Sequence, residues 1–432
     1  MSKPQPLYDL VRGYARSLVK VQYRRYRYGT EIPSEGPLML FCNHNNGLAD
    51  GALQFHLTRR RLRILAKFSL FEIFGLGSMV RALGAIPVYR QKDMVDTSMN
   101  IGSFAAIREA LAEGGAIMLF PEGESEFSHK LRSFKTGISR MALGAEDVLE
   151  FKCGVQLTPV GIAYDEPYAY RSKAHMWVGE TITIEDYAEM YVTDGRLAVR
   201  RLVKKLAAAQ RAITIELDEA SDHVPVILAE ELLPADGRHL PMRRKDLATR
   251  LGYLRAQDPE RAGELTSGLH SLASELKARA LTSADLEEPV SLPLELARGL
   301  GGALVLLLLV PVLALVGPPY LLGRTRAHRE ANPPDKRATI TLLLSTLTLG
   351  LWAVALPLTV GLAYGSKAGW ITAAAYALAC LSVAPLWENR QELRRAISKL
   401  SAGRMRKQLT LKAELLRTSV VGLAQVQEPS AD

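Results

Sequence analysis

The sequence predicts an α/β domain with a mixed, mostly parallel sheet flanked by helices, followed by a helical hairpin and a C-terminal region of transmembrane helices. Three observations predict this architecture. Short apolar runs alternate with amphipathic stretches up to about residue 220, as strands alternate with helices in an α/β domain. Leucine stripes of helical period follow over 223–296. The region 297–388 then contains apolar runs long enough to cross a bilayer.

Residues 1–35 are expected to form an amphipathic membrane-surface helix. Apolar residues recur at helical spacing from Leu7 to Val21, with arginines and tyrosines among them. A basic, tyrosine-rich helix of this kind can lie in the headgroup layer of a membrane. The alternative is a helix packed on the domain, with its basic face in water.

The first chemically informative stretch follows a buried strand predicted over Leu38 to Cys42. His44 and Asp50 lie on the turn between this strand and the next helix. A turn allows the two side chains to face each other, as an imidazole base and the carboxylate that holds it must. The alternative is an ordinary turn, in which both side chains face water.

Later strands also end in polar residues. Arg90 ends one strand, where an arginine can present its planar fork to a phosphate. Glu122 and Gly123 follow the next buried strand. Lys135 stands just before a predicted helix, where its charge and the free backbone N–H groups would form an anion pocket. Open α/β sheets bind their ligands at strand ends, so these residues are candidates for one site.

Pro159 interrupts the last long apolar run of the domain, 155–163. Because proline has no N–H to donate, it indicates a sheet edge, a bulge or a strand end.

The composition indicates an anionic partner. The chain of 432 residues has a formal net charge of +9, which suits a membrane surface or a phosphate-bearing substrate. The basic residues form no helix-turn-helix or RNA-recognition pattern, so we expect a lipid bilayer as partner and no nucleic acid. Cys42, Cys153 and Cys380 lie far apart, and no residues show metal-ligand spacing. We therefore expect neither a metal nor a cofactor.

The segment 223–296 is predicted to form a helical hairpin, which would serve as a spacer or packing module, or alternatively as a lid or partner site. The apolar region 297–388 divides into three runs: 299–322, 339–364 and 370–387.

The second and third apolar runs are predicted to cross the membrane, and 299–322 to be re-entrant or interfacial because of its prolines. Basic residues flank the two crossing helices on their outer sides, whereas the tip between them carries only Lys367. The positive-inside rule then places both basic segments in the cytoplasm and the tip outside. The basic helical tail, 389–432, would lie against anionic headgroups. The expected location is the cell membrane, multi-pass, with the α/β domain on its cytoplasmic face.

Four motifs in this order resemble the blocks of the glycerolipid acyltransferases, the superfamily of lysophosphatidate and glycerol-3-phosphate acyltransferases. The motifs are His-x5-Asp at His44, Gly-Ala-Ile-Pro-Val-Tyr-Arg ending at Arg90, Phe-Pro-Glu-Gly-Glu-Ser containing Glu122, and Leu-Thr-Pro-Val-Gly-Ile around Pro159. The resemblance places an acyltransferase domain at 36–222. It implies a membrane-bound enzyme that moves an acyl chain from acyl-CoA or acyl carrier protein to a hydroxyl of a phosphorylated glycerol.

The resemblance also implies roles for the residues that match. His44 would be the general base, and Asp50 would orient it. The hydroxyl would attack the thioester directly, without a covalent acyl-enzyme. The expected acceptor is 1-acylglycerol-3-phosphate, with glycerol-3-phosphate or another lysophospholipid as the alternative.

Arg90 would bind the acceptor phosphate, Glu122 and Gly123 would build the acceptor pocket, and Pro159 would border the acyl or acceptor channel. Lys135 is added from its charge and its position before a helix, and not from the resemblance.

Two departures from the family pattern bear on the acceptor. Five residues, Gly47 among them, separate His44 from Asp50, where the usual motif has four. A glycine-containing loop can absorb one extra residue, and the yeast-type glycerol-3-phosphate branch resembles this chain in that spacing. Glu124 stands where the usual third block continues with threonine and arginine, which weakens lysophosphatidate as the acceptor. A non-catalytic lipid-binding or scaffold protein of the same fold is the alternative from a different class.

Overall fold

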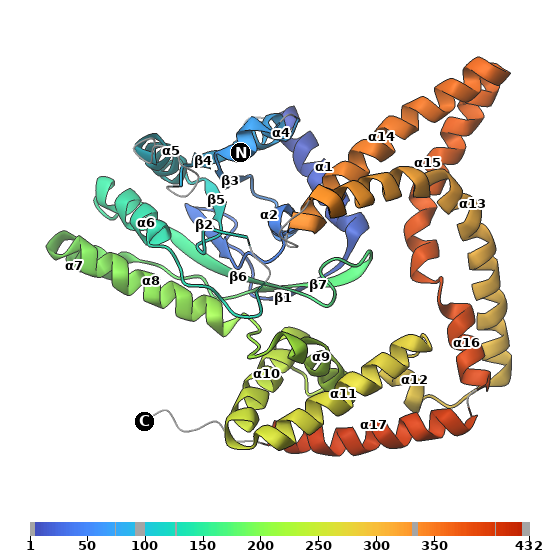
Figure 1. Ribbon diagram of the computed structural model, residues 1–432. Coiled ribbons are helices and arrows are strands. Elements are labelled where there is room, and N and C mark those ends of the chain that lie inside the picture. The colour runs from blue at the N-terminus through green and yellow to red at the C-terminus, as the bar shows by residue number, and fades with distance from the viewer. Residues whose placement is uncertain are drawn as a thin grey trace. The chain divides into compact units, whose positions relative to one another are not determined.

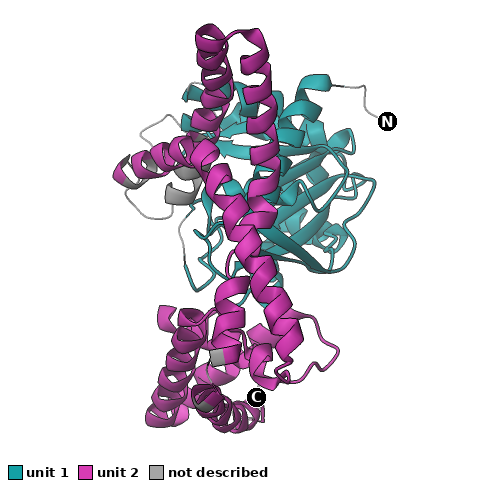
Figure 2. Ribbon diagram, turned by 90° about the vertical axis from the view of Figure 1, so that its right-hand side faces the viewer, with its two compact units in different colours: residues 1–215 teal, residues 216–432 magenta. Residues whose placement is uncertain are grey.

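The computed structural model describes residues 5–73, 75–90, 100–125, 128–330, 336–401 and 403–425. It divides into two compact units, Met1–Ile215 and Glu216–Asp432, which we call unit 1 and unit 2 (Figure 2).

Unit 1 is built on a mixed sheet, which within the described residues has seven strands in the order β1-β7-β6-β2-β5-β3-β4 (Figure 1). The strands are β1 (Tyr23–Gly29), β2 (Leu38–Cys42), β3 (Leu62–Lys67), β4 (Ile86–Val88), β5 (Ala116–Leu119), β6 (Gln156–Tyr164) and β7 (Ser172–Val178). Neighbouring strands run parallel except for β6 and β7, which are antiparallel. The predicted mixed, mostly parallel sheet is therefore confirmed.

Helices cover both faces of this sheet. The helices of unit 1 are α1 (Pro6–Gln22), α2 (Gly47–Gln54), α3 (Ser69–Glu72), α4 (Leu76–Ala82), α5 (Asn100–Ala112), α6 (Gly137–Val148), α7 (Ala188–Thr193) and α8 (Gly195–Ala212). Alternate residues of β2 enter different cores: Leu38 and Leu40 pack with α1 and α2, whereas Met39 and Phe41 pack with α5, α6 and α8. Two buried faces explain why β2 is apolar throughout.

The N-terminal segment corrects one prediction. The helix ends at Gln22, and residues 23–29 are the edge strand β1, paired with β7. The strand pairs with β7 along its whole length, Tyr23 is buried in the core, and Arg24 and Arg27 are exposed. Helix α1 buries Tyr8 and Val19 against the domain and exposes an apolar stripe on its other side that contains Leu7 and Leu10. Packing on the domain is thus observed, and a membrane-facing role for the outer stripe stays a prediction.

Pro159 corrects a second prediction, because it lies inside β6 opposite Phe41 and not at an edge or a strand end. Its carbonyl accepts the N–H of Gly179, at 3.0 Å, just beyond the last residue of β7. The N–H and C=O of one strand residue point to the same side, so the missing donor of Pro159 faces the place where β7 has already ended. The Gly179 carbonyl accepts the Thr30 hydroxyl there instead, at 2.7 Å.

Unit 2 is helical. Its helices are α9 (His223–Leu232), α10 (Leu240–Gln257), α11 (Pro259–Ala278), α12 (Ser283–Glu287), α13 (Leu292–Glu330), α14 (Lys336–Tyr364), α15 (Ser366–Glu388), α16 (Glu392–Ser401) and α17 (Gly403–Ala424). The two predicted leucine stripes lie on α10 and α11, and their leucines from Leu247 to Leu276 are buried. Helix α17 packs on both.

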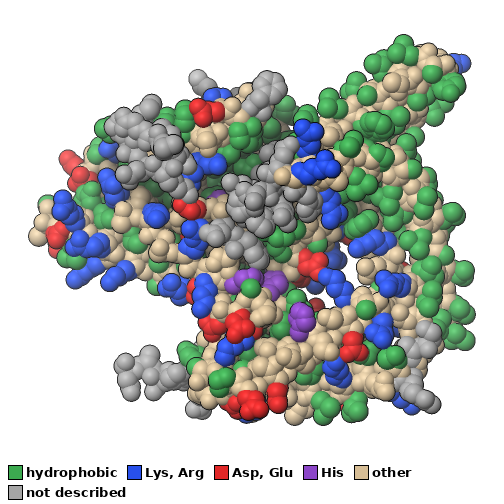
Figure 3. Space-filling view, viewed as in Figure 1, with side chains coloured by type: hydrophobic (Ala, Val, Ile, Leu, Met, Phe, Trp, Pro, Cys, Tyr) green, Lys and Arg blue, Asp and Glu red, His purple; other side chains and the backbone are tan. Residues whose placement is uncertain are grey.

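Within the described residues, three helices are long and apolar enough to cross a membrane: Leu292–Arg326, Leu344–Tyr364 and Ser366–Leu400. Figure 3 shows apolar side chains along the hairpin of α14 and α15. Helix α13 is continuous through the prolines from Pro311 to Pro319 and bends along its length (Figure 1). The structure shows no turn back within 299–322, as a re-entrant segment would need, so that part of the prediction is corrected; an interfacial position stays a prediction.

The basic tail is also corrected in part. Its cations do not all face headgroups, because several pair with carboxylates of unit 2. Lys399 contacts Asp285 at 2.7 Å and Glu288 at 2.9 Å, and Arg395 also binds Asp285. Burial raises the pKa of Asp285, but the hydrogen bonds from Arg395, Lys399 and Thr282 outweigh it and hold that pKa at about 2. Asp285 therefore stays ionised and ties α12 to α16.

Candidate active site

The candidate site lies at the carboxyl end of the central strands. The loop from Asn43 to Asn46 leaves β2 and leads into α2, whose first turn contains Asp50. Asn43 anchors this loop to the neighbouring strand: its Nδ2 donates to the Ile162 carbonyl at 2.9 Å, and its Oδ1 accepts the Ile162 N–H at 2.8 Å. Two bonds from one amide imitate a ladder pair where the strand has ended.

His44 and Asp50 face each other, as predicted. His44 Nδ1 lies 3.0 Å from Asp50 Oδ2, and the Asp50 side chain is fully buried. A carboxylate only accepts hydrogen bonds, so Nδ1 carries the proton, and Nε2 of the neutral ring keeps its lone pair. The ring stacks on Phe120, with centroids 3.7 Å apart, and remains partly exposed at 16%. This arrangement presents a proton acceptor to solvent from a fixed position.

Two further donors complete the environment of Asp50. The Asn46 N–H donates to Oδ2 at 2.7 Å, and the Tyr164 hydroxyl donates to Oδ1 at 2.6 Å. Burial, followed by the Asp50 charge, raises the pKa of Tyr164 well above its usual value, so the phenol stays protonated and keeps donating. The sequence analysis missed Tyr164. Its signal was available, because Tyr164 ends the strand that neighbours the His44 loop.

The loop after β5 supports the loop of His44. The backbone N–H of His44 donates to Glu122 Oε1 at 2.8 Å, and the N–H of Gly47 donates to Ser125 Oγ at 2.9 Å. Glu122 is buried, and burial raises the pKa of its carboxyl, although the hydrogen bond from His44 opposes the shift. Glu122 thus positions the loop of the predicted base through the backbone.

Arg90, Gly123 and Lys135 gather on the same side of this loop. Arg90 donates to the Gly123 carbonyl at 2.8 Å. Gly123 has a φ of +76°, a backbone conformation that favours glycine, and a Cβ there would be in van der Waals contact with Lys135 Cγ, at 3.4 Å. The exposed Lys135 is bound to the loop through its N–H, which donates to the Pro121 carbonyl at 2.8 Å. The structure therefore brings Arg90, Glu122, Gly123 and Lys135 together.

Pro159 does not join this group by any contact that the structure describes. It lies on the strand opposite Phe41, and its side chain packs near Gly179. Its predicted role at a channel stays a prediction. The described residues contain no group of three or more potential metal ligands, and the expectation that no metal is needed is not tested by that observation.

Part of the chain matches a known protein family. Residues 24–163 match the Acyltransferase family model. Glycerol-3-phosphate O-acyltransferase 2 of Saccharomyces cerevisiae is 24% identical over 255 residues, which are 56% of this chain and 34% of that protein. A 1-acyl-sn-glycerol-3-phosphate acyltransferase of Chlamydomonas reinhardtii is 29% identical over 128 residues, or 30% of this chain and 34% of that protein. The chain thus spans about a third of these relatives.

Among solved structures, the 1-acyl-sn-glycerophosphate acyltransferase PlsC of Thermotoga maritima aligns with 48% of this chain and 80% of its own, at 19% identity and a TM-score of 0.34. The matched segment 24–163 contains His44, Asp50, Arg90, Glu122 and Gly123. This segment therefore matches an acyltransferase domain, in agreement with the resemblance carried by the four motifs.

Proposed function

We propose that this protein transfers an acyl group from an acyl thioester to a hydroxyl of a glycerol phosphate at a membrane surface. The observation that carries the proposal is the 3.0 Å contact between Nδ1 of His44 and the buried Asp50, in a His44 side chain that remains partly exposed. A neutral imidazole oriented by a carboxylate is a competent base near pH 7. The alternative of a non-catalytic scaffold gives no reason to bury a carboxylate against a partly exposed imidazole.

In this mechanism His44 Nε2 removes the proton of the acceptor hydroxyl while its oxygen attacks the thioester carbonyl. The imidazolium that forms is stabilised by Asp50. Collapse of the tetrahedral intermediate breaks the C–S bond, and the thiolate leaves with the proton held by His44. Tyr164 and the Asn46 N–H keep Asp50 in place during both proton transfers.

The acceptor phosphate is assigned to the cations beside Gly123. Arg90 uses one N–H on the Gly123 carbonyl, which orients its guanidinium next to the third motif. Lys135 is exposed on the same loop. A planar guanidinium and a mobile ammonium together suit a phosphate monoester.

Two acceptor substrates are candidates. The family resemblance implies 1-acylglycerol-3-phosphate. Glycerol-3-phosphate is favoured by the two Saccharomyces cerevisiae relatives named glycerol-3-phosphate O-acyltransferase, which match over 56% and 54% of this chain. The donor is acyl-CoA or acyl carrier protein.

Ion pairs in unit 2 support a membrane topology with an even number of crossings. Asp285 precedes the three apolar helices and Lys399 lies at the C-terminal end of the third, yet their charged groups lie 2.7 Å apart. The Cβ of Ala396 on α16 also lies 3.7 Å from the Cβ position of Gly299, at the start of α13. Contact between the two ends of the apolar region supports a position of both ends on one side of the membrane, with an even number of crossings by the three helices. We assign the crossings to α14 and α15 and keep 299–322 interfacial, with unit 1 on the cytoplasmic face of the cell membrane.

Replacing the base tests the reaction. We expect His44→Ala to lower acyl transfer by about 10²- to 10⁴-fold, because general-base catalysis contributes that much. Purified protein in detergent would receive labelled acyl-CoA or acyl carrier protein, with glycerol-3-phosphate and 1-acylglycerol-3-phosphate in separate reactions.

The control is His56→Ala, at a half-buried histidine of unit 1 outside the site, which should retain activity. Product with one acceptor alone identifies the acceptor. Unchanged transfer by a folded His44→Ala protein would contradict the proposed mechanism.

Tyr164→Phe tests the support of Asp50. The variant removes a hydrogen bond to a buried charge, worth about 1.5–3 kcal/mol, and should lower kcat roughly 10- to 100-fold. The KM values for both substrates should change little, because Tyr164 contacts Asp50 and not the substrates. A loss confined to KM would show that Tyr164 acts on binding instead.

Glu122→Gln tests the effect of burial on the Glu122 carboxyl through the pH dependence of stability. A raised pKa means that the folded state holds the proton more tightly than the unfolded state, so the Glu122 contribution to stability falls as pH rises from about 4.3 toward neutrality. Glutamine accepts the same N–H but does not ionise. The midpoint of thermal unfolding of the variant, relative to the unmodified chain, should therefore rise between pH 4 and pH 7. A relative midpoint that falls over this range would refute the assignment.

Cysteine labelling tests the topology. One cysteine, at Arg329 or at Ser366, would be introduced into a chain that lacks Cys153 and Cys380 and keeps only the buried Cys42, and whole cells would be treated with an impermeant maleimide. Two crossings predict labelling of Ser366→Cys from outside, and of Arg329→Cys only after permeabilisation. Outside labelling of Arg329→Cys would mean that α13 crosses.

A further inference from the structure

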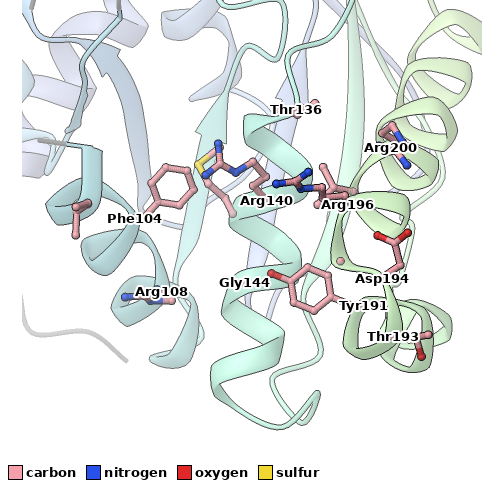
Figure 4. Close-up of a pocket in the computed structure, with 14 residues that line it drawn as sticks. Phe104, Arg108, Thr136, Arg140, Gly144, Tyr191, Thr193, Asp194, Arg196 and Arg200 are labelled. Atoms are coloured by element: carbon pink, nitrogen blue, oxygen red, sulfur yellow. The ribbon is translucent and has the colours of Figure 1, made fainter. Parts of the chain in front are cut away.

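Unit 1 contains an open pocket of about 1040 Å³ on the helical face of the sheet opposite to α1 and α2. Helix α6 forms its floor, and α5, α7 and α8 provide its walls. Figure 4 shows Arg108, Arg140, Arg196 and Arg200 around it, with Phe104 on one side of α6 and Tyr191 on the other.

The pocket carries a concentrated positive charge. Its four arginines form no ion pair with any carboxylate in the part of the chain that the structure describes. One carboxylate lines the wall, that of Asp194, and it accepts the Leu197 N–H at 2.9 Å as the cap of α8. Four guanidinium groups around one concavity repel one another, and a bound anion would remove that repulsion.

A solvated basic face is the simpler explanation for exposed arginines, but two features indicate a built pocket. The Arg140 guanidinium lies over the Phe104 ring, 5.4 Å from its centroid, so its orientation is restrained. The floor is open at Gly144, where a Cβ would meet nothing within 4 Å. Flat apolar surfaces from Phe104 and Tyr191 accompany the charges. Aromatic faces beside guanidinium groups suit a ligand with both a ring and phosphates.

One end of the pocket adjoins the loop of the candidate active site. Thr136 lines this end, and the preceding residue, Lys135, packs beside Gly123. Gly123 follows Glu122, which accepts the His44 N–H. From Thr136 to Gly144 a helix rises roughly 12 Å, so the arginines lie along a path that leads away from the site. An elongated ligand anchored here would extend its other end toward His44.

We propose that this pocket binds the 3′-phosphorylated adenosine diphosphate portion of an acyl-CoA donor. This inference rests on the proposed function, because it assigns the donor of that reaction. The guanidinium groups receive the phosphates, the adenine lies against an aromatic ring, and the pantetheine arm runs along α6 toward the thioester position. An acidic carrier protein needs a raised or flat basic surface, whereas these arginines surround a concavity over a single helix.

The test measures binding of CoA itself to the full-length protein in detergent, by isothermal titration calorimetry and without turnover. Arg196→Ala and Arg200→Ala should each weaken CoA binding about 10- to 100-fold, as loss of a charge-assisted hydrogen bond does. Gly144→Phe should abolish binding by filling the floor. The matched controls are Arg201→Ala, an exposed arginine of α8 outside the pocket, and Gly263→Phe, at an open helical position in unit 2. Both controls should bind CoA normally.

The readouts separate this inference from the proposed function. CoA binding retained by His44→Ala and lost by the arginine variants supports the pocket even if no acyl transfer is detected. In active protein the same variants should raise the KM for acyl-CoA and leave the KM for the acceptor unchanged. Equal loss in Arg201→Ala, CoA binding unaffected by the pocket variants, or transfer from acyl carrier protein with no CoA binding would each overturn the assignment.

Discussion

The candidate site depends on the burial of one carboxylate. Asp50 is fully buried, and a charge removed from water is costly unless hydrogen bonds replace its hydration. Three donors do so: the ring of His44, the N–H of Asn46 and the hydroxyl of Tyr164. Each donor must lie within hydrogen-bond distance of the Asp50 carboxylate. The buried charge therefore fixes the loop after β2 and the end of β6 relative to each other. The imidazole orientation follows from this constraint.

Sheet topology explains why distant motifs meet. Strands β2 and β5 are parallel neighbours, so the loops that follow them start side by side. Backbone groups of the first loop then donate to Glu122 and Ser125 of the second. Strand β4 lies beyond β3, and the long Arg90 side chain spans this gap to reach Gly123. The motifs of His44, Arg90 and Glu122 lie at strand ends, which the sheet brings to one edge, whereas the Pro159 motif lies within β6.

The basic residues of the chain divide by environment. Arg395 and Lys399 pair with carboxylates that precede α13, and so tie the two ends of the apolar region together. Arg12 and Arg60 donate to backbone carbonyls of unit 1. The arginines that line the pocket over α6 have no such partner in the described structure. Their positive charges face the pocket. The net charge of the chain does not distinguish these three environments of basic residues, because each environment is defined by the group that the tertiary structure places beside the cation.

Local pattern determined much of this protein. Apolar runs identified the strands, helical period identified the leucine stripes, and residue order identified the motifs, because each signal spans only a few neighbouring residues. The pairing of His44 with Asp50 was also predictable, since a turn allows two side chains six residues apart to face each other. Tertiary structure alone decided the rest. Residues 23–29 became a strand because β7 offered an edge, Pro159 was tolerated because β7 ended beside it, and Tyr164 reached Asp50 across 114 positions. These outcomes depend on partners far away in the chain, which no local pattern encodes.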